Sequence, residues 1–275
     1  MRRFADLHIH TLHSDSTLSP QEVVEQARQN GLSCVGITDH DILDGIPPAF
    51  EEAKKYDLEV VAGIELSCEM NGREVHILGY LFDCAYEPLR DRLKVIQNVR
   101  AERMKMMIAK LESLGIEGIR FEDVAALANT KALGRPHLAM ILQKKGIVGD
   151  IKGAFDRYLA EGAPAYAPKF KQTPGEAIRL IREAGGVAVL AHPMLMNRDE
   201  IIPGLVREGL QGLEVYYPNC AVHVIQFYEH LAKKHALCMT GGSDAHGSLR
   251  GYTFVGKVKI PYELVEKLKE RVHGP

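Results

Sequence analysis

The sequence predicts an α/β fold, a TIM-like barrel interrupted by a helical insertion. Two observations predict it. Short apolar segments alternate with helical segments about seven times along the chain, which is typical of parallel strands joined by crossover helices. Several apolar segments also end in histidine, aspartate or glutamate, and barrel enzymes carry their chemistry at the carboxyl ends of their strands.

Composition limits the classes of function. The 275 residues suit one barrel, and 46% hydrophobic residues suffice for a sizeable core. A formal net charge of −2 provides no basic surface for wrapping duplex nucleic acid. Five scattered cysteines without a C-x-x-C motif favour reduced thiols. Because we find no secretion signal and no apolar stretch of about 20 residues, we expect a cytoplasmic protein that does not span a membrane.

The first predicted strand, Phe4–His10, ends in two histidines one residue apart. Side chains at i and i+2 of a strand lie on the same side, so His8 and His10 leave it together as candidate metal ligands. Asp15 follows in a short polar loop and offers an oxygen ligand. Taken alone, the two histidines also fit a solvated surface pair, and it is the later strand ends that favour a metal site.

The first predicted helix has signals at both of its ends. Ser19–Glu22 is a capping box with proline at the first helical position, and Gly31 marks the helix end. The buried strand Cys34–Thr38 follows and leads into Asp39-His40-Asp41. His40 is the candidate ligand, and the two flanking aspartates are candidates to orient its imidazole ring.

The third predicted strand, Glu59–Ile64, ends in Glu65. Asn71-Gly72 then predicts a hairpin whose second arm is Arg73–Tyr80. His76 lies in that arm, on a strand and not in a loop. A lone strand histidine is usually structural, but beside Glu65 it becomes a candidate ligand.

The pattern changes near residue 85, where a long charged helix begins. Strand-like segments are scarce from there to about residue 170, and one of the later helices opens with Gly134-Arg135-Pro136-His137. We therefore expect residues 1–85 and 170–275 to form the barrel and residues 86–169 to form a helical insertion subdomain.

The alternation of strands and helices returns after the insertion. Thr173 is the predicted N-cap of the next helix. The strand Val187–Ala191 ends in His192, and a later strand, Leu237–Thr240, runs into a glycine-rich segment with two more candidates. Val255–Ile260 is the expected final strand, before a closing helix.

The strand ends together offer six histidines and three carboxylates. They are His8, His10, Asp15, His40, Glu65, His76, His192, Asp244 and His246. This number of ligands suits two or three divalent ions, and imidazole mixed with carboxylate fits manganese, zinc or iron. Clustered divalent ions can share a hydroxide nucleophile and polarise a phosphoryl oxygen.

These motifs resemble those of the polymerase and histidinol phosphatase (PHP) family. The resemblance covers the chain apart from the insertion and rests on Asp6–His10, Thr38–Asp41, Glu65, His76, Ala191–Pro193 and Gly242–His246. It implies a distorted (β/α)7 barrel with a trinuclear metal centre. Carried over by motif, the first ion is held by His8, His10, Glu65 and Asp244, the second by Asp15, His40 and His246, and the third by Glu65, His76 and His192.

Within the family, the insertion motif is similar to that of the subgroup that removes the 3′-phosphate from nucleoside 3′,5′-bisphosphates. Close relatives of that subgroup trim short 5′-phosphorylated RNA in the 5′→3′ direction. The resemblance implies attack by metal-activated hydroxide, with Arg135 and His137 holding the phosphate and His137 or a water protonating the leaving oxygen. Taken alone, the arginine fits an exposed helix start and the histidine a structural role. Lys169 and Lys171 are further candidates for phosphate contact.

Alternatives remain open at this point. The chain could be a 5′→3′ exoribonuclease that uses the same centre, or a histidinol phosphatase, which the long insertion disfavours. An amidohydrolase also begins with His-x-His, but such enzymes often use a modified lysine that the strand ends here lack. A non-catalytic metal-binding module would be expected to have lost ligands, and all of the candidate positions are kept. The expected partner is a small phosphorylated nucleotide or short RNA.

Overall fold

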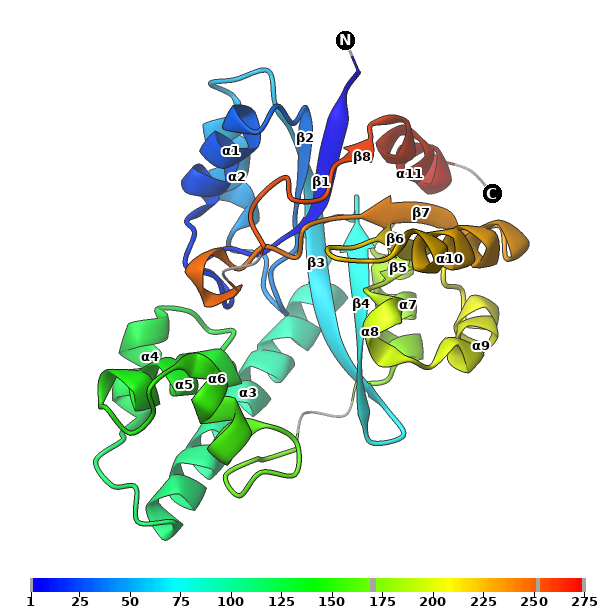
Figure 1. Ribbon diagram of the computed structural model, residues 1–275. Coiled ribbons are helices and arrows are strands. Elements are labelled where there is room, and N and C mark those ends of the chain that lie inside the picture. The colour runs from blue at the N-terminus through cyan, green and yellow to red at the C-terminus, as the bar shows by residue number, and fades with distance from the viewer. Residues whose placement is uncertain (1, 169–171, 251–252, 274–275) are drawn as a thin grey trace.

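The computed structural model describes residues 2–168, 172–250 and 253–273 and is built on one eight-stranded sheet (Figure 1). The strand order is β7-β6-β5-β4-β3-β2-β1-β8. The strands are β1 (Phe4–Ile9), β2 (Cys34–Ile37), β3 (Glu59–Met70), β4 (Arg73–Tyr80), β5 (Val187–Leu190), β6 (Gly212–Tyr216), β7 (Cys238–Gly241) and β8 (Ile260–Pro261).

The sheet curls into a nearly closed barrel. β1, β2 and β3 are parallel neighbours, as are β5, β6 and β7. The antiparallel strand β4 joins the two groups, and β8 pairs antiparallel with β1. A parallel bridge between Ile9 and Ala245 brings the segment after β7 back to the end of β1. The prediction of a distorted barrel is confirmed.

Two predicted strands differ from the structure. The third strand continues through Glu65 into the hairpin, so that β3 is one strand of 12 residues. The prediction of a final strand over Val255–Ile260 is wrong, since β8 contains only Ile260 and Pro261. Gly256 adopts a φ of +81° and donates its N–H to a carboxylate oxygen of Asp6 at 2.7 Å, which holds this apolar segment as a loop.

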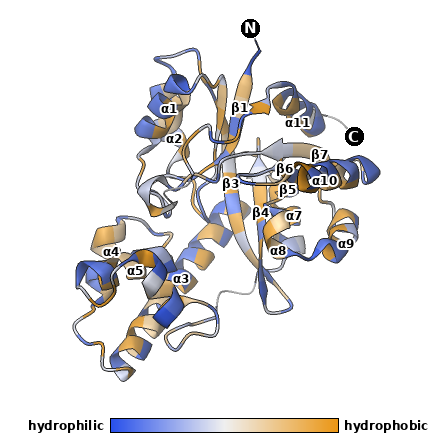
Figure 2. Cartoon of the chain, in the orientation of Figure 1, coloured by the Kyte–Doolittle hydropathy of each residue, from blue (hydrophilic) through white to orange (hydrophobic). Residues whose placement is uncertain are grey.

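Helices cover the barrel on its outer side. They are α1 (Pro20–Gln29), α2 (Ile46–Ala53), α7 (Pro174–Glu183), α8 (Pro193–Met196), α9 (Ile202–Arg207), α10 (Val222–Lys234) and α11 (Glu263–His273), with 3-10 turns at Asp199–Ile201 and Gly247–Arg250. The predicted caps are confirmed: Ser19 and Thr173 each form a capping box with the glutamate three residues later. Helices α1, α10 and α11 carry both hydrophilic and hydrophobic residues, as expected of helices that cover a sheet (Figure 2).

The insertion consists of α3 (Glu87–Ser113), α4 (Phe121–Ala128), α5 (Arg135–Lys144), α6 (Ile151–Ala154) and a π-helical turn at Phe155–Leu159. Figure 1 shows α3 to α6 grouped on one side of the sheet, away from β7 and β8. These helices enclose a hydrophobic cluster of their own, which includes Met104, Leu111, Leu138 and Leu142. We propose that residues 86–169 form a separate subdomain; its second boundary falls outside the described residues, as do Lys169 and Lys171.

Alternation along β1 separates the core from the site. Ala5 and Leu7 join the apolar cluster that contains Val189 and Leu268. His8 and His10 leave the opposite side of the same strand, and both are completely buried. Within the part of the chain that the structure describes, no helix is long and apolar enough to cross a membrane.

Candidate metal centre

Glu65 lies at the centre of the predicted ligands. One of its carboxylate oxygens, Oε2, lies 3.2 Å from Nε2 of His8 and 3.1 Å from Nε2 of His10. The other, Oε1, lies 2.7 Å from Nδ1 of His76 and 3.0 Å from Nε2 of His192. Each oxygen therefore faces different imidazoles, the arrangement that a carboxylate bridging two ions requires.

The backbone fixes Glu65 in this position. Its N–H donates to the carbonyl of Asp39 at 3.2 Å, and its carbonyl accepts the N–H of Asp41 at 3.1 Å. These bonds extend the β2–β3 ladder past the end of β2 and bring His40 level with Glu65. The Nδ1 atom of His40 then lies 3.3 Å from Oε2 of Glu65.

Asp15 gathers a second group of histidines. Its Oδ1 lies 3.4 Å from Nε2 of His246 and 3.8 Å from Nδ1 of His10. Its Oδ2 lies 4.0 Å from Nε2 of His40. The loop after β1 thus returns to the site and places a carboxylate opposite the segment that follows β7.

Asp244 closes the barrel end from the other side. Its N–H donates to the carbonyl of His8 at 2.8 Å, which ties the segment after β7 to β1. Its Oδ1 lies 3.1 Å from Nε2 of His10, and its Oδ2 accepts the hydroxyl of Tyr217 at 2.7 Å. The tyrosine therefore fixes the rotation of this carboxylate.

The structure places all nine predicted residues at this barrel end, and eight of them form three overlapping groups, within each of which the donor atoms lie within 4.8 Å of one another. They are His8, His10, Glu65 and Asp244; His10, Asp15, His40 and His246; and His40, Glu65 and His76. The first matches the set expected for the first ion. The second adds His10 to the expected set, and the third contains His40 where His192 was expected.

The polar atoms of the site fit coordination by a cation. Nδ1 of His10, Oδ1 of Asp15 and Nδ1 of His40 are buried and have no hydrogen-bond partner among the residues that the structure describes. Buried polar atoms are almost always bonded, so unbonded atoms that converge on one place indicate a further partner. A divalent cation coordinated by imidazole and carboxylate is the partner that suits them.

Protonation in the metal-free chain leads to the same conclusion. Burial lowers the pKa of His10, but hydrogen bonds to Asp244 and Glu65 outweigh it and raise the pKa to about 9. Burial likewise opposes the charges of Glu65 and Glu74 on His76, whose pKa also rises to about 9. Despite burial, the histidines around Glu65 hold the pKa of its carboxyl well below the usual range. Without a metal, protons supply the positive charge that the carboxylates need.

Glu214 is a site residue that the sequence reasoning missed. It is completely buried, and its Oε1 lies 2.9 Å from Nδ1 of His8. Its Oε2 accepts the backbone N–H of His192 at 2.7 Å, where His192 has a φ of +28°. The available signal was one acidic residue within the otherwise uncharged strand β6.

Glu74 was missed as well. It hydrogen-bonds to Nε2 of His76, and its other oxygen lies 3.6 Å from Nη2 of Arg135. A carboxylate on the far nitrogen of a ligating histidine orients the ring and raises its basicity. The signal was the two-residue spacing from His76, which places both side chains on the same face of β4.

The two aspartates beside His40 have roles other than the expected one. Asp39 accepts the backbone N–H of Thr11 at 2.7 Å and the hydroxyl of Ser14 at 2.5 Å, so it holds the loop that carries Asp15. Asp41 pairs with Arg100 of α3. Their bonds to these groups, and not contacts with the imidazole of His40, account for the burial of both carboxylates.

Arg135 lines a cavity at the site, whereas His137 is buried and is not among the residues that line this cavity. A cavity of about 310 Å³ is lined by His40, Glu65, Glu74, His76, Arg135, His192, Leu195, Met196 and Asp244. His137 is 4% exposed, and its Nδ1 accepts the N–H of Gly134 at 3.0 Å at the start of α5. Burial lowers its pKa, so this imidazole is neutral near pH 7.

Comparison with known proteins adds four likenesses. The PHP domain matches residues 6–188. A 3′,5′-nucleoside bisphosphate phosphatase of Chromobacterium violaceum is 32% identical over 256 residues, which cover 91% of this chain and 90% of that protein. The 5′-3′ exoribonuclease Rnm of Salmonella typhimurium is 36% identical over 255 residues, 88% of this chain and 84% of that protein. A solved structure assigned as a metal-dependent phosphoesterase of Bifidobacterium adolescentis superposes with a TM-score of 0.89 at 30% identity, covering 97% of this chain and 96% of the other.

Proposed function

Because this chain belongs to the PHP family of metal-dependent phosphoesterases, we propose that it removes the 3′-phosphate from nucleoside 3′,5′-bisphosphates. The observation that carries the proposal is the cavity in which Arg135, supplied by the insertion, faces the candidate ligands supplied by the barrel. A site that combines a cationic anchor with a metal centre suits a substrate that carries two phosphate groups.

We propose that the eight clustered residues, together with His192 beside Glu65, hold two or three divalent ions. When bound, such ions activate a water nucleophile and neutralise the charge that develops on the phosphoryl oxygens. The donor set of imidazole and carboxylate suits manganese, zinc and iron alike, so it leaves the metal open. Glu65 would bridge two of the ions, since its oxygens face different histidines.

Arg135 is the proposed phosphate contact. Its side chain is 20% exposed and lies between Glu74 and the carbonyl of Leu159, which accepts from Nη1 at 3.4 Å. A guanidinium held in this way presents its remaining donors to a phosphate in two-point contact. His137 is the residue two positions later, and its bond to Gly134 fixes the start of α5. We therefore assign to His137 chiefly the positioning of Arg135, and to solvent in the cavity the proton that the leaving O3′ takes up.

The mouth of the cavity suits a nucleoside. Leu195 is 61% exposed and lines the cavity together with Met196 and the polar side chains. An apolar side chain left exposed beside a cluster of charged groups is a surface on which the flat face of a nucleobase can pack. The proposed substrate therefore places its 3′-phosphate among the ligands and its base against α8.

A 5′→3′ exoribonuclease is the second candidate, favoured by the 36% identity to the Salmonella typhimurium relative. Both reactions add water across a P–O3′ bond, with the water oxygen ending on phosphorus and a proton ending on O3′. The relatives named above are phosphatases and nucleases, which weighs against a non-catalytic module and gives no support to a histidinol phosphatase.

The position of cleavage tests the proposal. Adenosine 3′,5′-bisphosphate incubated with the protein and manganese should yield 5′-AMP and inorganic phosphate, separated by ion-exchange chromatography. Accumulation of 3′-AMP, or an unchanged nucleotide in the presence of manganese, zinc or iron, would contradict it.

A further inference from the structure

Arg100 of α3 joins three segments that are far apart in the sequence. Its Nε donates to Oδ2 of Asp41 at 2.9 Å, and its Nη2 also contacts that oxygen. Nη2 donates to the hydroxyl of Ser67 at 3.0 Å, and Nη1 donates to the carbonyl of Leu133 at 2.9 Å. One guanidinium therefore bonds to the barrel on one side and to the insertion on the other.

Each partner stands next to a site residue. Asp41 follows His40, and Ser67 lies two positions beyond Glu65 on β3. The carbonyl of Leu133 belongs to the loop that leads through Gly134 into Arg135. By holding its three partners, Arg100 therefore fixes the positions of His40 and Glu65 relative to Arg135, the proposed phosphate contact.

The contact is buried. Asp41 is completely buried and Arg100 has a side chain that is 11% exposed. Asp41 also has a φ of +54°, a conformation that a non-glycine residue keeps only when its surroundings hold it. Gln97, one turn earlier on α3, donates from Nε2 to the carbonyl of Asp41 at 3.0 Å. Two side chains of α3 thus hold the residue that follows His40.

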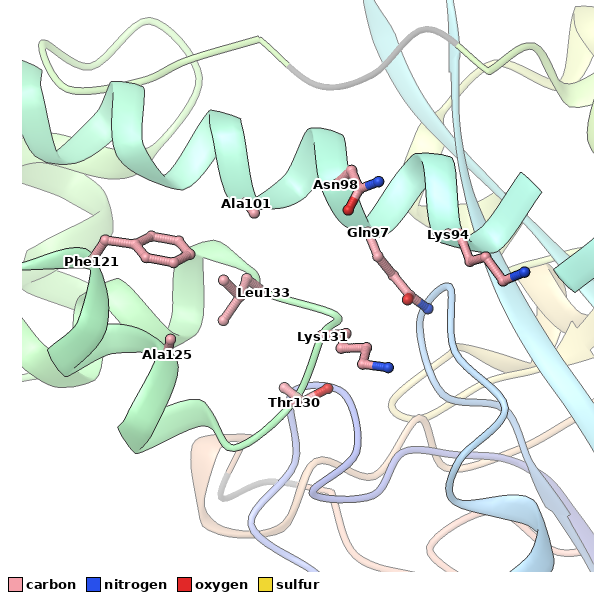
Figure 3. Close-up of a pocket in the computed structure, with 9 residues that line it drawn as sticks. All are labelled: Lys94, Gln97, Asn98, Ala101, Phe121, Ala125, Thr130, Lys131 and Leu133. Carbon is pink, nitrogen blue, oxygen red and sulfur yellow. The ribbon is translucent and has the colours of Figure 1, made fainter. Parts of the chain in front are cut away.

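The same face of the insertion holds the other ligand loop. Figure 3 shows a cavity with Gln97 on α3 and Thr130 on the facing loop. The hydroxyl of Thr130 donates to the carbonyl of His13, within the loop that carries Asp15. The insertion therefore bonds to the loop after β1 through Thr130 and to the loop after β2 through Gln97 and Arg100, and Arg100 makes the most bonds at this junction.

We propose that Arg100 is a positioning residue that couples the insertion to the metal centre, setting His40 and Glu65 on one side and Arg135 on the other. Its role toward Arg135 rests on the proposed function, whereas its role toward the ligands does not. Arg100 does not line the cavity within the described structure, so it acts through its partners. Only arginine provides donors in three directions from one rigid plane.

Arg100→Lys tests the coupling, since lysine keeps the charge beside Asp41 but cannot bond to all three partners. Metal content is measured after dialysis of the manganese-loaded protein against a series of free Mn²⁺ concentrations. We expect the Mn²⁺ midpoint to rise about tenfold. At saturating manganese, we expect kcat/KM for adenosine 3′,5′-bisphosphate to fall about tenfold, and expect no further fall when the change is added to Arg135→Ala.

Two further variants complete the design. Ser67→Ala removes one bond of Arg100 and should move the Mn²⁺ midpoint in the same direction by less, which keeps the test usable if Arg100→Lys folds poorly. Arg92→Lys is the matched control, because Arg92 joins the same helix to Glu176 of α7 at 3.2 Å, away from the site, and should change neither readout.

The outcomes separate the inference from the proposed function. A lower melting temperature for Arg100→Lys with an unchanged Mn²⁺ midpoint would overturn the inference and leave a purely structural residue. Additive losses in the double variant would overturn its link to Arg135. If the wild-type protein leaves the bisphosphate intact, the proposed function fails, and the Mn²⁺ midpoint still decides whether Arg100 sets the ligands.

Discussion

Nδ1 of His8 lies 2.9 Å from Oε1 of Glu214, and both side chains are completely buried. A carboxylate at this distance accepts a hydrogen bond from the Nδ1–H group, which keeps the proton on Nδ1 and leaves Nε2 of the same ring with its lone pair. That atom faces Glu65 at 3.2 Å, inside the cluster. Glu214 therefore selects the histidine tautomer that can bind a metal.

Glu214→Gln should weaken metal binding about 10- to 100-fold, the usual effect of removing such a partner. The amide can accept the N–H of His192 only by turning its NH₂ group toward Nδ1 of His8, which favours the wrong tautomer. Metal content at fixed free Mn²⁺ measures the loss. Glu229→Gln, which changes a carboxylate bonded to Tyr216 outside the cluster, is the control. Equal metal content in the two variants would contradict the assignment.

Asp244→Ala should lower kcat by about 10³-fold, because losing a ligand removes several kcal/mol of metal-based transition-state stabilisation. The fold should persist, since the backbone bond from Asp244 to His8 does not need the side chain. Steady-state kinetics measures the fall in kcat, and circular dichroism checks that the fold persists. Asp244→Asn keeps an acceptor for the hydroxyl of Tyr217 and isolates the charge. Full activity in Asp244→Ala would remove this residue from the metal centre.

Arg135→Ala should raise KM for a nucleoside bisphosphate about 10- to 100-fold, the value of charge-assisted hydrogen bonds worth about 1.5–3 kcal/mol. Arg135→Lys should recover only part of this, since an ammonium cannot make the two-point contact. Arg157→Ala is the control, because that arginine lies on the surface of the same insertion, beside Tyr158. An unchanged KM in Arg135→Ala would show that the phosphate anchor lies elsewhere.

When a chelator removes the metal, the stability of the folded protein should fall as the pH rises. Burial lowers the pKa of His10, but its bonds to Asp244 and Glu65 outweigh burial, so the pKa is about 9 in the folded chain against 6.5 in the unfolded one. A raised folded pKa stabilises the protein fully below 6.5, and this contribution is lost as pH rises through 9. His76 acts in the same sense.

The melting temperature of the EDTA-treated protein should therefore fall between pH 6.5 and 9, the interval set by His10. With manganese the fall should be absent or reversed, because metal binding displaces those protons. Differential scanning calorimetry in both conditions measures this. A melting temperature that rises with pH in EDTA would contradict the protonation described for the metal-free site.

The candidate ligands could be predicted from the sequence because strand ends are local features and parallel strands bring them to one edge. Glu214 lies within a strand, and only the register of Leu213 with Leu190 places it beyond the end of β5, beside His192. Arg100 has partners 33 and 59 residues away, which helical periodicity does not reveal. Val255–Ile260 has a strand-like composition, but its turn at Gly256 is fixed by the distant Asp6.

Parallel assays of one enzyme preparation test the central claim most directly. Adenosine 3′,5′-bisphosphate and a 5′-phosphorylated RNA pentamer are incubated with manganese at equal concentrations, and initial rates of phosphate release and of oligomer shortening are compared. The account predicts rapid release of phosphate from the nucleotide, little shortening of the pentamer, and loss of both on addition of EDTA. Efficient stepwise shortening of the pentamer with slow release from the nucleotide would make RNA trimming the main activity and contradict the proposed function.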